Sequence, residues 1–384
     1  MIKYALEFPL KYTKNSKEGD NVKQVMVICN SLVGLMSFRR ELLETLLDKK
    51  YGVTVVAPEY KFSKDLKKMG CNFIPIEMEL RGTNPFKDLK LIKAYKQILK
   101  ENKPNIVLTY TIKPNVYAGY VCGKLKIPYV ANVTGLGTSV EQPGLLQKIT
   151  LFLYKRGLKK AKCVFFQNKD NLDFMLKHGI VKENYKLIPG SGVNLEYHKL
   201  LPYPKDKTIR FLFISRILYE KGIGEYLECA KYIKEKYPNT EFHILGKYDD
   251  DKYTKIIKDL EKKNIVIYHG QVDDVREYHK ISNCTIHPSF YPEGMSNVLL
   301  ESCAAGRPII TTNRPGCKEV VDDGKNGYLI ECKDTNTLIK KVERFINLSY
   351  KEKEQMGLNA RKKVEKDFDR NIVINEYMRE IEGA

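Results

Sequence analysis

The sequence predicts an α/β protein made of two doubly wound, parallel-sheet domains. Three observations support this prediction. At 384 residues the chain is long for a single hydrophobic core. Short apolar runs, typical of strands buried on both faces, alternate with helical patterns along the whole chain. A stretch rich in glycine and proline interrupts this alternation near residues 190–207, which indicates a domain boundary.

The first half begins with an apolar strand, Gln24–Cys29, then a loop ending at Gly34 and a helix through residues 38–43. Glycine in that loop would let a ligand approach the backbone closely. The Gly-x-Gly-x-x-Gly fingerprint is absent, which disfavours an NAD-dependent oxidoreductase. The alternation continues with predicted strands Gly52–Ala57, Asn72–Ile76, Ile106–Tyr110, Tyr129–Val133 and Cys163–Gln167, and with predicted helices Ser63–Met69, Asn84–Asn102, Asn115–Leu125 and Leu145–Lys162.

Two loops of the first half follow strand ends, where doubly wound sheets bind their ligands. Residues 111–115 include Lys113, which can contact a phosphate or a sugar hydroxyl or can be an ordinary solvated lysine. Residues 134–138 include Gly135 and Gly137, which can line a ligand or simply make a turn. We predict that these residues face a substrate.

The second half restarts with strand Ile209–Ile214, and Arg216 follows its end. Lys221 comes near the start of the next helix. The two cations can converge on one anion, although two exposed loop residues are the alternative.

Further along, Gly246 and Lys247 follow strand Phe242–Leu245, and Gln271 follows strand Ile265–His269. Backbone at these strand ends can contact a nucleotide base. The acidic run 249–251 precedes a helix, and we interpret it as a solvated charge run rather than a metal site.

The most informative stretch, residues 287–301, follows strand Cys284–His287. Pro288 and Pro292 keep the segment before Glu293 out of a helix. Helical spacing begins after Gly294, which puts Glu293 in a loop and Glu301 about two turns inside the helix.

The start of that helix offers unpaired amides and a partial positive charge, which suit a phosphate. Carboxylates on both sides suit hydroxyl groups. A phosphate flanked by hydroxyls describes a nucleotide sugar. In the alternative interpretation Glu293 is only a favourable charge before a helix and Glu301 an exposed helical residue. The predicted donor-binding residues here are Gly294, Met295, Ser296, Asn297, Val298, Leu299 and Glu301.

Residues 287–330 together resemble the donor site of retaining glycosyltransferases of family 4, which have the GT-B fold. The Glu-x7-Glu signature is followed by Gly-x-x-Glu, from Gly316 to Glu319, and by Asn-Gly at 326–327. The similarity extends from about residue 24 to 384. Arg216 and Lys221 are similar to the family's diphosphate-binding pair, and Gly34 lies where its N-terminal glycine loop does.

The resemblance implies a metal-independent, retaining hexosyltransferase with no cofactor, whose catalytic residues are Arg216, Lys221 and Glu293. It implies that Glu293 holds the transferred sugar and Glu301 the ribose. The substrates implied are a nucleotide sugar such as UDP-GalNAc or UDP-GlcNAc and a lipid-diphosphate-linked saccharide, used to build capsule, O-antigen or related glycans. Many relatives carry a histidine in the loop after the fourth strand, where this chain reads Tyr110-Thr111-Ile112-Lys113.

Charge is distributed unevenly along the chain. Residues 1–190 hold 33 Lys and Arg against 16 Asp and Glu, and residues 191–384 hold 33 against 31. The basic half would attract an anionic membrane or a nucleic acid, or it would serve only solubility. Helix 145–162 can lie on an anionic bilayer or be a core helix with a charged end. Its clustered cations are Lys155, Arg156, Lys159, Lys160 and Lys162.

Nine cysteines without a Cys-x-x-Cys pair favour a reducing cytoplasm, and scattered histidines predict no metal site. No apolar run reaches the roughly 20 residues that span a bilayer. We therefore expect a cytoplasmic enzyme, peripheral on the inner face of the plasma membrane. The predicted segments are a polar leader at 1–22, a first domain at 23–190, a linker at 191–207, a nucleotide-sugar domain at 208–365 and a C-terminal helix at 366–384 that can return to the first domain.

Two other function classes remain. A sugar-nucleotide epimerase of the same architecture would share the diphosphate site and need no acceptor. A nucleic-acid-binding protein would explain the basic half, but the two glutamates would repel a phosphate backbone and no nucleic-acid-binding motif is present.

Overall fold

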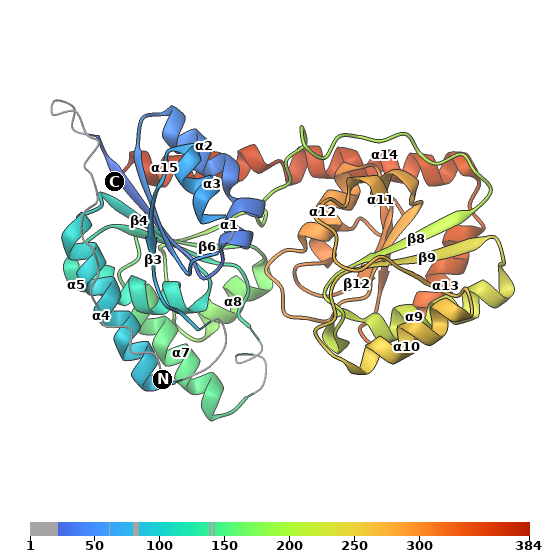
Figure 1. The fold of residues 1–384 in the computed structure, drawn as a ribbon, viewed down its shortest axis with the longest axis horizontal. Coiled ribbons are helices and arrows are strands. Elements are labelled where there is room, and N and C mark those ends of the chain that lie inside the picture. Colours follow the sequence, from blue (N-terminus) through green and yellow to red (C-terminus); the bar gives the residue numbers. More distant parts are fainter. Residues whose placement is uncertain (1–21, 61, 80–83, 138–139, 141–142) are drawn as a thin grey trace.

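The computed structural model describes residues 22–60, 62–79, 84–137, 140 and 143–384. The predicted leader at 1–22 lies outside the described residues except for Val22. Two parallel sheets form two lobes that lie side by side (Figure 1). The predicted fold class, two doubly wound α/β domains, is confirmed.

The first lobe contains a seven-stranded sheet of order β3-β2-β1-β4-β5-β6-β7, and every pairing is parallel. Its strands are β1 Gln24–Ile28, β2 Gly52–Ala57, β3 Asn72–Pro75, β4 Ile106–Tyr110, β5 Tyr129–Val133, β6 Cys163–Phe166 and β7 Tyr185–Leu187. The order reverses between β1 and β4, so their carboxyl ends open the crevice in which such sheets bind ligands.

Helices cover both faces of this sheet. They are α1 Leu32–Phe38, α2 Arg40–Asp48, α3 Ser63–Met69, α4 Pro85–Asn102, the π turn η1 Pro114–Ala118, α5 Gly119–Leu125, α7 Leu145–Leu158 and α8 Lys169–Lys177. One prediction is wrong here: Gly34 lies in the first turn of α1 and not in a loop. Ser31 caps the helix by accepting a hydrogen bond from the Gly34 amide, and this cap moves the helix start back to Leu32.

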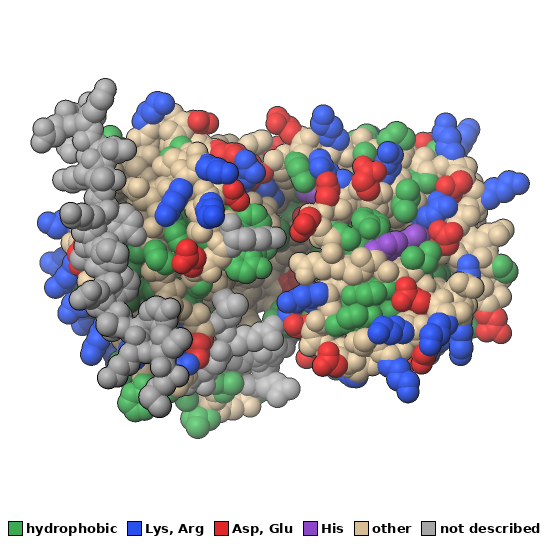
Figure 2. All heavy atoms as spheres, viewed as in Figure 1, with side chains coloured by type: hydrophobic (Ala, Val, Ile, Leu, Met, Phe, Trp, Pro, Cys, Tyr) green, Lys and Arg blue, Asp and Glu red, His purple; other side chains and the backbone are tan. Residues whose placement is uncertain are grey.

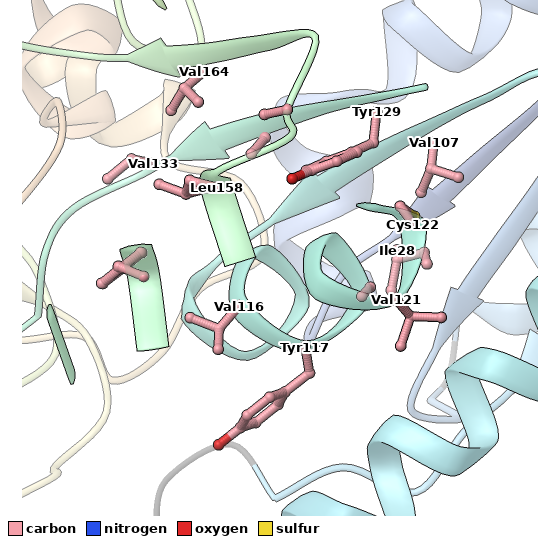
Figure 3. Close-up of a cluster of buried hydrophobic side chains, with 14 of the residues drawn as sticks. Ile28, Val107, Val116, Tyr117, Val121, Cys122, Tyr129, Val133, Leu158 and Val164 are labelled. Atoms are coloured by element: carbon pink, nitrogen blue, oxygen red, sulfur yellow. The ribbon is translucent and has the colours of Figure 1, made fainter. Parts of the chain in front are cut away.

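The core on one face of the first sheet brings η1, α5 and α7 against strands β4 to β6 (Figure 3). Val116, Val121 and Leu158 pack onto the sheet there, and the Tyr129 hydroxyl donates to the carbonyl of Gly157 at 2.7 Å. The helices on this face therefore pack tightly onto the sheet, and α7 lies in the outer helical layer.

The second lobe repeats the architecture with a six-stranded sheet of order β10-β9-β8-β11-β12-β13. Its strands are β8 Ile209–Ile214, β9 Thr240–Leu245, β10 Ile267–Tyr268, β11 Cys284–His287, β12 Ile309–Thr312 and β13 Gly327–Ile330. Its helices are η2 Tyr219–Lys221, α9 Ile223–Lys236, α10 Lys252–Lys262, α11 Arg276–Ile281, α12 Asn297–Ala304, η3 Lys318–Val320, α13 Thr335–Ile346 and α14 Tyr350–Asp367. The reversal now falls between β8 and β11, the two strands that precede the predicted diphosphate and sugar residues.

The last helix, α15 Arg370–Glu382, packs on the first lobe (Figure 1). Tyr377 and Met378 belong to the core on the second face of the seven-stranded sheet. At the crossing, the Arg370 guanidinium binds both carboxylate oxygens of Glu41 at 2.7 Å. The two lobes are thus joined both by residues 188–208, between β7 and β8, and at this return crossing.

Among the described residues, no helix combines the length and the apolar character required to cross a membrane.

Candidate active site

The predicted sugar-binding loop lies at the carboxyl end of β11. Ser296 occupies the N-cap position of α12, and the helix begins at Asn297. Glu301 is therefore the fifth helical residue, a little more than one turn inside, so the predicted two turns are wrong. The reason is that Met295 and Ser296, the two residues after Gly294, stay outside the helix, and the Ser296 amide donates to Gly316 O at 2.8 Å.

That hydrogen bond changes which amides can meet an anion. The Ser296 amide is already bound to Gly316 O. Among the described residues, no side chain caps the first turn of α12. The N–H groups of Asn297, Val298 and Leu299 remain at the positive end of α12.

Lys221 and Glu293 form an ion pair at this loop. The Lys221 ammonium donates to Glu293 Oε1, and the two side chains are 11% and 15% exposed. Gly222 follows at φ 75°, and a Cβ there would come within 2.2 Å of Pro288 O, so glycine is needed for η2 to pack against the loop. This ion pair thus links the segment that follows β8 to the segment that follows β11.

The charge state of Glu293 follows from its neighbours. Burial acts to raise its pKa, but Lys221 and His287 outweigh it and lower the pKa to about 2. His287 Nε2 lies 3.9 Å from Glu293 Oε1 and 3.3 Å from Ser296 Oγ. Glu293 is therefore a carboxylate at neutral pH, able to accept hydrogen bonds.

Arg216 lies beside Lys221, as predicted from their spacing. Both cations face the ring of Tyr291, at 5.7 Å for the Arg216 guanidinium and 4.6 Å for the Lys221 ammonium. Arg216 Nη1 also donates to Asp249 Oδ2 at 2.6 Å. The interpretation of residues 249–251 as only a solvated charge run is therefore wrong for Asp249, which binds Arg216 across the ends of β8 and β9.

Glu301 differs from Glu293 in having no hydrogen-bond partner among the residues that the structure describes. No described residue lies within hydrogen-bonding distance of its carboxylate, and burial raises its pKa to about 7, with Arg370 opposing this. A partly buried, unpaired carboxylate is costly unless a ligand completes its hydrogen bonds. This is the property expected of a group that binds ribose hydroxyls.

Residues that follow β5 and β6 of the first lobe contact this loop. Gly135 has φ 141°, and a Cβ there would lie 3.2 Å from Pro292 O. A Cβ on Gly294 would lie 2.5 Å from both Thr134 O and Gln167 Oε1. Asn168, the N-cap of α8, donates from its side chain to Gly294 O at 2.6 Å. Loops of both lobes therefore meet at Glu293 and Gly294.

Lys113 has a different environment. Its ammonium binds Asp88 Oδ1 of α4 at 2.8 Å, and the Tyr117 hydroxyl donates to the other oxygen of the same carboxylate at 2.7 Å. The lysine thus ties the loop after β4 to α4. In the same loop Thr111, a β-branched residue, has φ 72°, an uncommon conformation that often marks functional loops.

The remaining predicted residues have different surroundings. Gly246 has φ 142°, and a Cβ there would overlap Ser215 O at 1.7 Å, so this glycine lets two strand ends touch. Lys247 and Gln271 are exposed beside it. Gly137 has φ 76°. Met295 is buried, with its side chain against Gly190.

Three further residues belong to the site, and sequence reasoning did not identify them: Asn168, Asp249 and Tyr291. Tyr291 lies inside the 287–301 stretch. Its position as an aromatic residue between Pro288 and Pro292 could have indicated a role in the site. Asn168 and Asp249 act on partners far away in sequence, so local spacing contained no sign of them.

Glycosyltransferase family models match residues in both lobes of the chain. The sequence model of the glycosyl transferases group 1 matches residues 201–363, which include all the site residues of the second lobe. The model named glycosyl transferase 4-like matches residues 35–168 of the first lobe. Both lobes thus match glycosyltransferase models, and the chain is a glycosyltransferase.

Two characterised relatives are similar to this glycosyltransferase over most of its length. It is 27% identical to the N,N'-diacetylbacillosaminyl-diphospho-undecaprenol alpha-1,3-N-acetylgalactosaminyltransferase of Campylobacter jejuni, over 89% of this chain and 94% of the relative. It is 25% identical to the UDP-Gal:alpha-D-GlcNAc-diphosphoundecaprenol alpha-1,3-galactosyltransferase of Escherichia coli, over 90% and 95%.

Among solved structures, a glycosyltransferase from Rickettsia africae superimposes with a TM-score of 0.78 at 20% identity, covering 94% of this chain and 98% of that one. The two-lobed fold of this glycosyltransferase is therefore GT-B, as the resemblance implied.

Proposed function

We propose that this glycosyltransferase moves a hexose or N-acetylhexosamine from a nucleotide sugar, UDP-linked, onto a lipid-diphosphate-linked saccharide, with retention at the anomeric carbon. Both relatives above are named for diphospho-undecaprenol acceptors, and one is named for UDP-Gal. The product would serve capsule, O-antigen or related glycan synthesis on the cytoplasmic face of the plasma membrane.

One observation carries the donor assignment: Arg216 and Lys221 face one tyrosine ring beside the uncapped start of α12. As the glycosidic bond breaks, its electron pair goes to the diphosphate, whose charge rises. The two cations and the amides of residues 297–299 would then bind the leaving group more tightly than the intact donor, which lowers the barrier. We infer that these groups supply the positive charge without a metal ion.

The carboxylates would hold the two sugars of the donor. Glu293, ionised and next to Lys221, would accept hydrogen bonds from the transferred sugar. Glu301, whose carboxylate has no hydrogen-bond partner in the described part of the chain, would accept them from the ribose. The acceptor hydroxyl would attack from the face on which the diphosphate leaves, and a leaving phosphate oxygen would take its proton.

The first lobe would provide the acceptor side, since Gly135 and Asn168 reach the Glu293 loop. Incubation with UDP-sugars and a short-chain lipid-diphosphate saccharide tests the proposal: we expect UDP release that requires the acceptor and a product extended by one sugar. A sugar-nucleotide epimerase would convert the donor with no acceptor present, and that result would overturn the assignment.

A further inference from the structure

One helix face of the first lobe is apolar and uncovered. α7 buries Thr150, Tyr154 and Leu158 against the lobe. Its other side carries four apolar side chains that are 47% to 75% exposed: Leu145, Leu146, Ile149 and Phe152. Three of them recur at helical spacing, so they form a continuous stripe.

A second helix of the same lobe carries two further exposed apolar side chains. At the start of α4, Phe86 is 78% exposed and Leu89 is 57% exposed. α4 and α7 both pack on η1. Figure 2 shows hydrophobic side chains projecting from the lower end of the first lobe, where Figure 1 places the ends of these two helices. Six large apolar side chains thus gather on one end of the lobe, more than scattered surface residues explain.

The charges around the stripe are all positive on α7. The helix has no acidic residue, and Lys148, Lys155 and Arg156 are exposed along it. The Arg156 guanidinium lies 4.7 Å from the centre of the Phe152 ring. A second copy of the chain would bring the same cations face to face, which disfavours a symmetric dimer through this surface.

Lys162, which the sequence grouped with these cations, does not belong to them. Its ammonium donates to the carbonyl oxygen of Glu380 on α15 at 2.5 Å. The exposed cations that lie on α7 itself are Lys148, Lys155 and Arg156.

We propose that this surface, which we name the apolar tip, inserts into the headgroup region of an anionic bilayer. The apolar tip consists of Phe86, Leu89, Leu145, Leu146, Ile149 and Phe152 with the flanking Lys148, Lys155 and Arg156. Apolar side chains would enter the acyl boundary while cations bind acidic headgroups, each contributing attraction near the surface.

This inference rests on the proposed function for its purpose, because a lipid-diphosphate acceptor presents its sugars at a bilayer surface. Gly135, which touches the Glu293 loop, and Leu145 are ten residues apart in sequence. Even fully extended, that chain spans about 36 Å at most. The apolar tip therefore lies close enough to the cleft for a membrane-bound acceptor to be within reach.

Co-sedimentation of the full chain with vesicles tests the proposal. We expect binding to vesicles of 30 mol% phosphatidylglycerol in phosphatidylcholine at low ionic strength, weaker binding at high salt, and little binding to phosphatidylcholine alone. Ile149→Glu together with Phe152→Glu should lower the partition coefficient at least about tenfold, since two apolar side chains would lose their burial. The matched control is Ile256→Glu on α10, a 41% exposed isoleucine of the other lobe, which should bind as the wild type does.

The outcomes separate this inference from the enzyme assignment, because sedimentation needs no turnover. Wild-type protein that stays in the supernatant, binds both vesicle types equally or binds unchanged after the double substitution overturns the apolar tip as a membrane site. Loss of dimerisation in the variant, without vesicle binding in the wild type, would assign the surface to a second copy instead. Equal melting temperatures of variant and wild type show that the fold is intact.

Discussion

The side-chain amide of Asn168 donates to the carbonyl oxygen of Gly294, 2.6 Å away in the other lobe. The same amide lies 3.3 Å from Glu293 O. Its own carbonyl oxygen, Oδ1, accepts from the Asn171 amide at 2.8 Å and so caps α8. One side chain therefore fixes a helix start in the first lobe and the position of the sugar-binding loop in the second.

These two roles can be separated by substitution. Asn168→Ser and Asn168→Asp both retain an oxygen that caps α8, but neither retains the amide donor. We expect melting temperatures near that of the wild type and a fall in kcat/KM of roughly tenfold, the value of one net hydrogen bond. The aspartate variant should lose more, because its carboxylate would face two carbonyl oxygens.

Steady-state kinetics beside thermal unfolding check this prediction. Asn168→Ala is the comparison, since it removes the cap as well and should lower stability by about 1 kcal/mol. Unchanged kinetics in the serine and aspartate variants would show that the interlobe bond does not position Glu293.

The sequence predicted the fold well where single patterns are strong. Strands β2, β4, β5, β8 and β11 and helix α3 occur with the bounds expected, because largely apolar strand runs between turn residues leave little choice. The three-residue strand β7, Tyr185–Leu187, was missed because it is short and none of its side chains is buried, so it shows no apolar run. Gly34 was misplaced because a serine cap extended a helix over it.

The site could be predicted only in part for a related reason. Spacing within one segment placed Glu293, Arg216 and Lys221, since each follows a strand end. Asn168 is separated from Gly294 by 126 residues, and only the packing of two lobes brings them together. Asp249 appeared as one member of an acidic run, and nothing local distinguished it from its neighbours.

The Lys221–Glu293 pair predicts a combined loss of stability and activity. Lys221→Ala leaves a carboxylate that is 15% exposed without its partner, which should cost about 3–5 kcal/mol of unfolding free energy. Turnover should fall on the order of 10²–10³. The double variant Lys221→Met with Glu293→Gln removes both charges, so it should recover much of the stability and none of the activity.

Urea unfolding and turnover assays measure both effects. The exposed pair Lys236–Glu343 is the control: Lys236→Ala should cost less than about 1 kcal/mol and leave turnover unchanged. A Lys221→Ala protein as stable and active as the wild type would contradict both assignments.

Arg216 should affect activity almost alone. Its partner Asp249 has a 27% exposed side chain that water can solvate after Arg216→Ala, so stability should change little. Turnover should fall on the order of 10²–10³, because one cation at the leaving diphosphate is lost. Arg210→Ala is a matched control at the opposite end of β8, where Arg210 is also ion-paired. Comparable turnover in the two variants would remove Arg216 from the diphosphate site.

Glu301 makes donor binding sensitive to pH. Its pKa is raised to about 7 by burial, so the carboxylate that would accept ribose hydrogen bonds is partly protonated at neutral pH. Donor affinity should therefore fall about tenfold between pH 8 and pH 6, and Glu301→Gln should bind with little pH dependence over that range. Calorimetric titration at several pH values measures this; the same slope in both proteins would assign the effect to another group.

The same shift has a consequence for stability. The folded pKa of Glu301 lies above the ordinary value of about 4.3, so the native state holds the proton more tightly than the unfolded chain. Stability from this group is present at low pH and is lost as pH rises through about 7. Glu301→Gln should thus unfold at a higher temperature than the wild type at pH 8, with the difference shrinking as pH falls.

A substitution at Gly34 tests whether a ligand contacts α1, because its effect on stability can be measured separately from its effect on activity. It lies in the first turn of α1, and a Cβ there would meet nothing closer than Ser31, at 3.8 Å. Because alanine favours helices by up to about 1 kcal/mol over glycine, Gly34→Ala should melt at the same temperature or slightly higher. If a substrate approaches this turn, the added methyl group should nevertheless lower kcat/KM by tenfold or more. Full activity in a stable Gly34→Ala protein would show that no ligand approaches this turn closely.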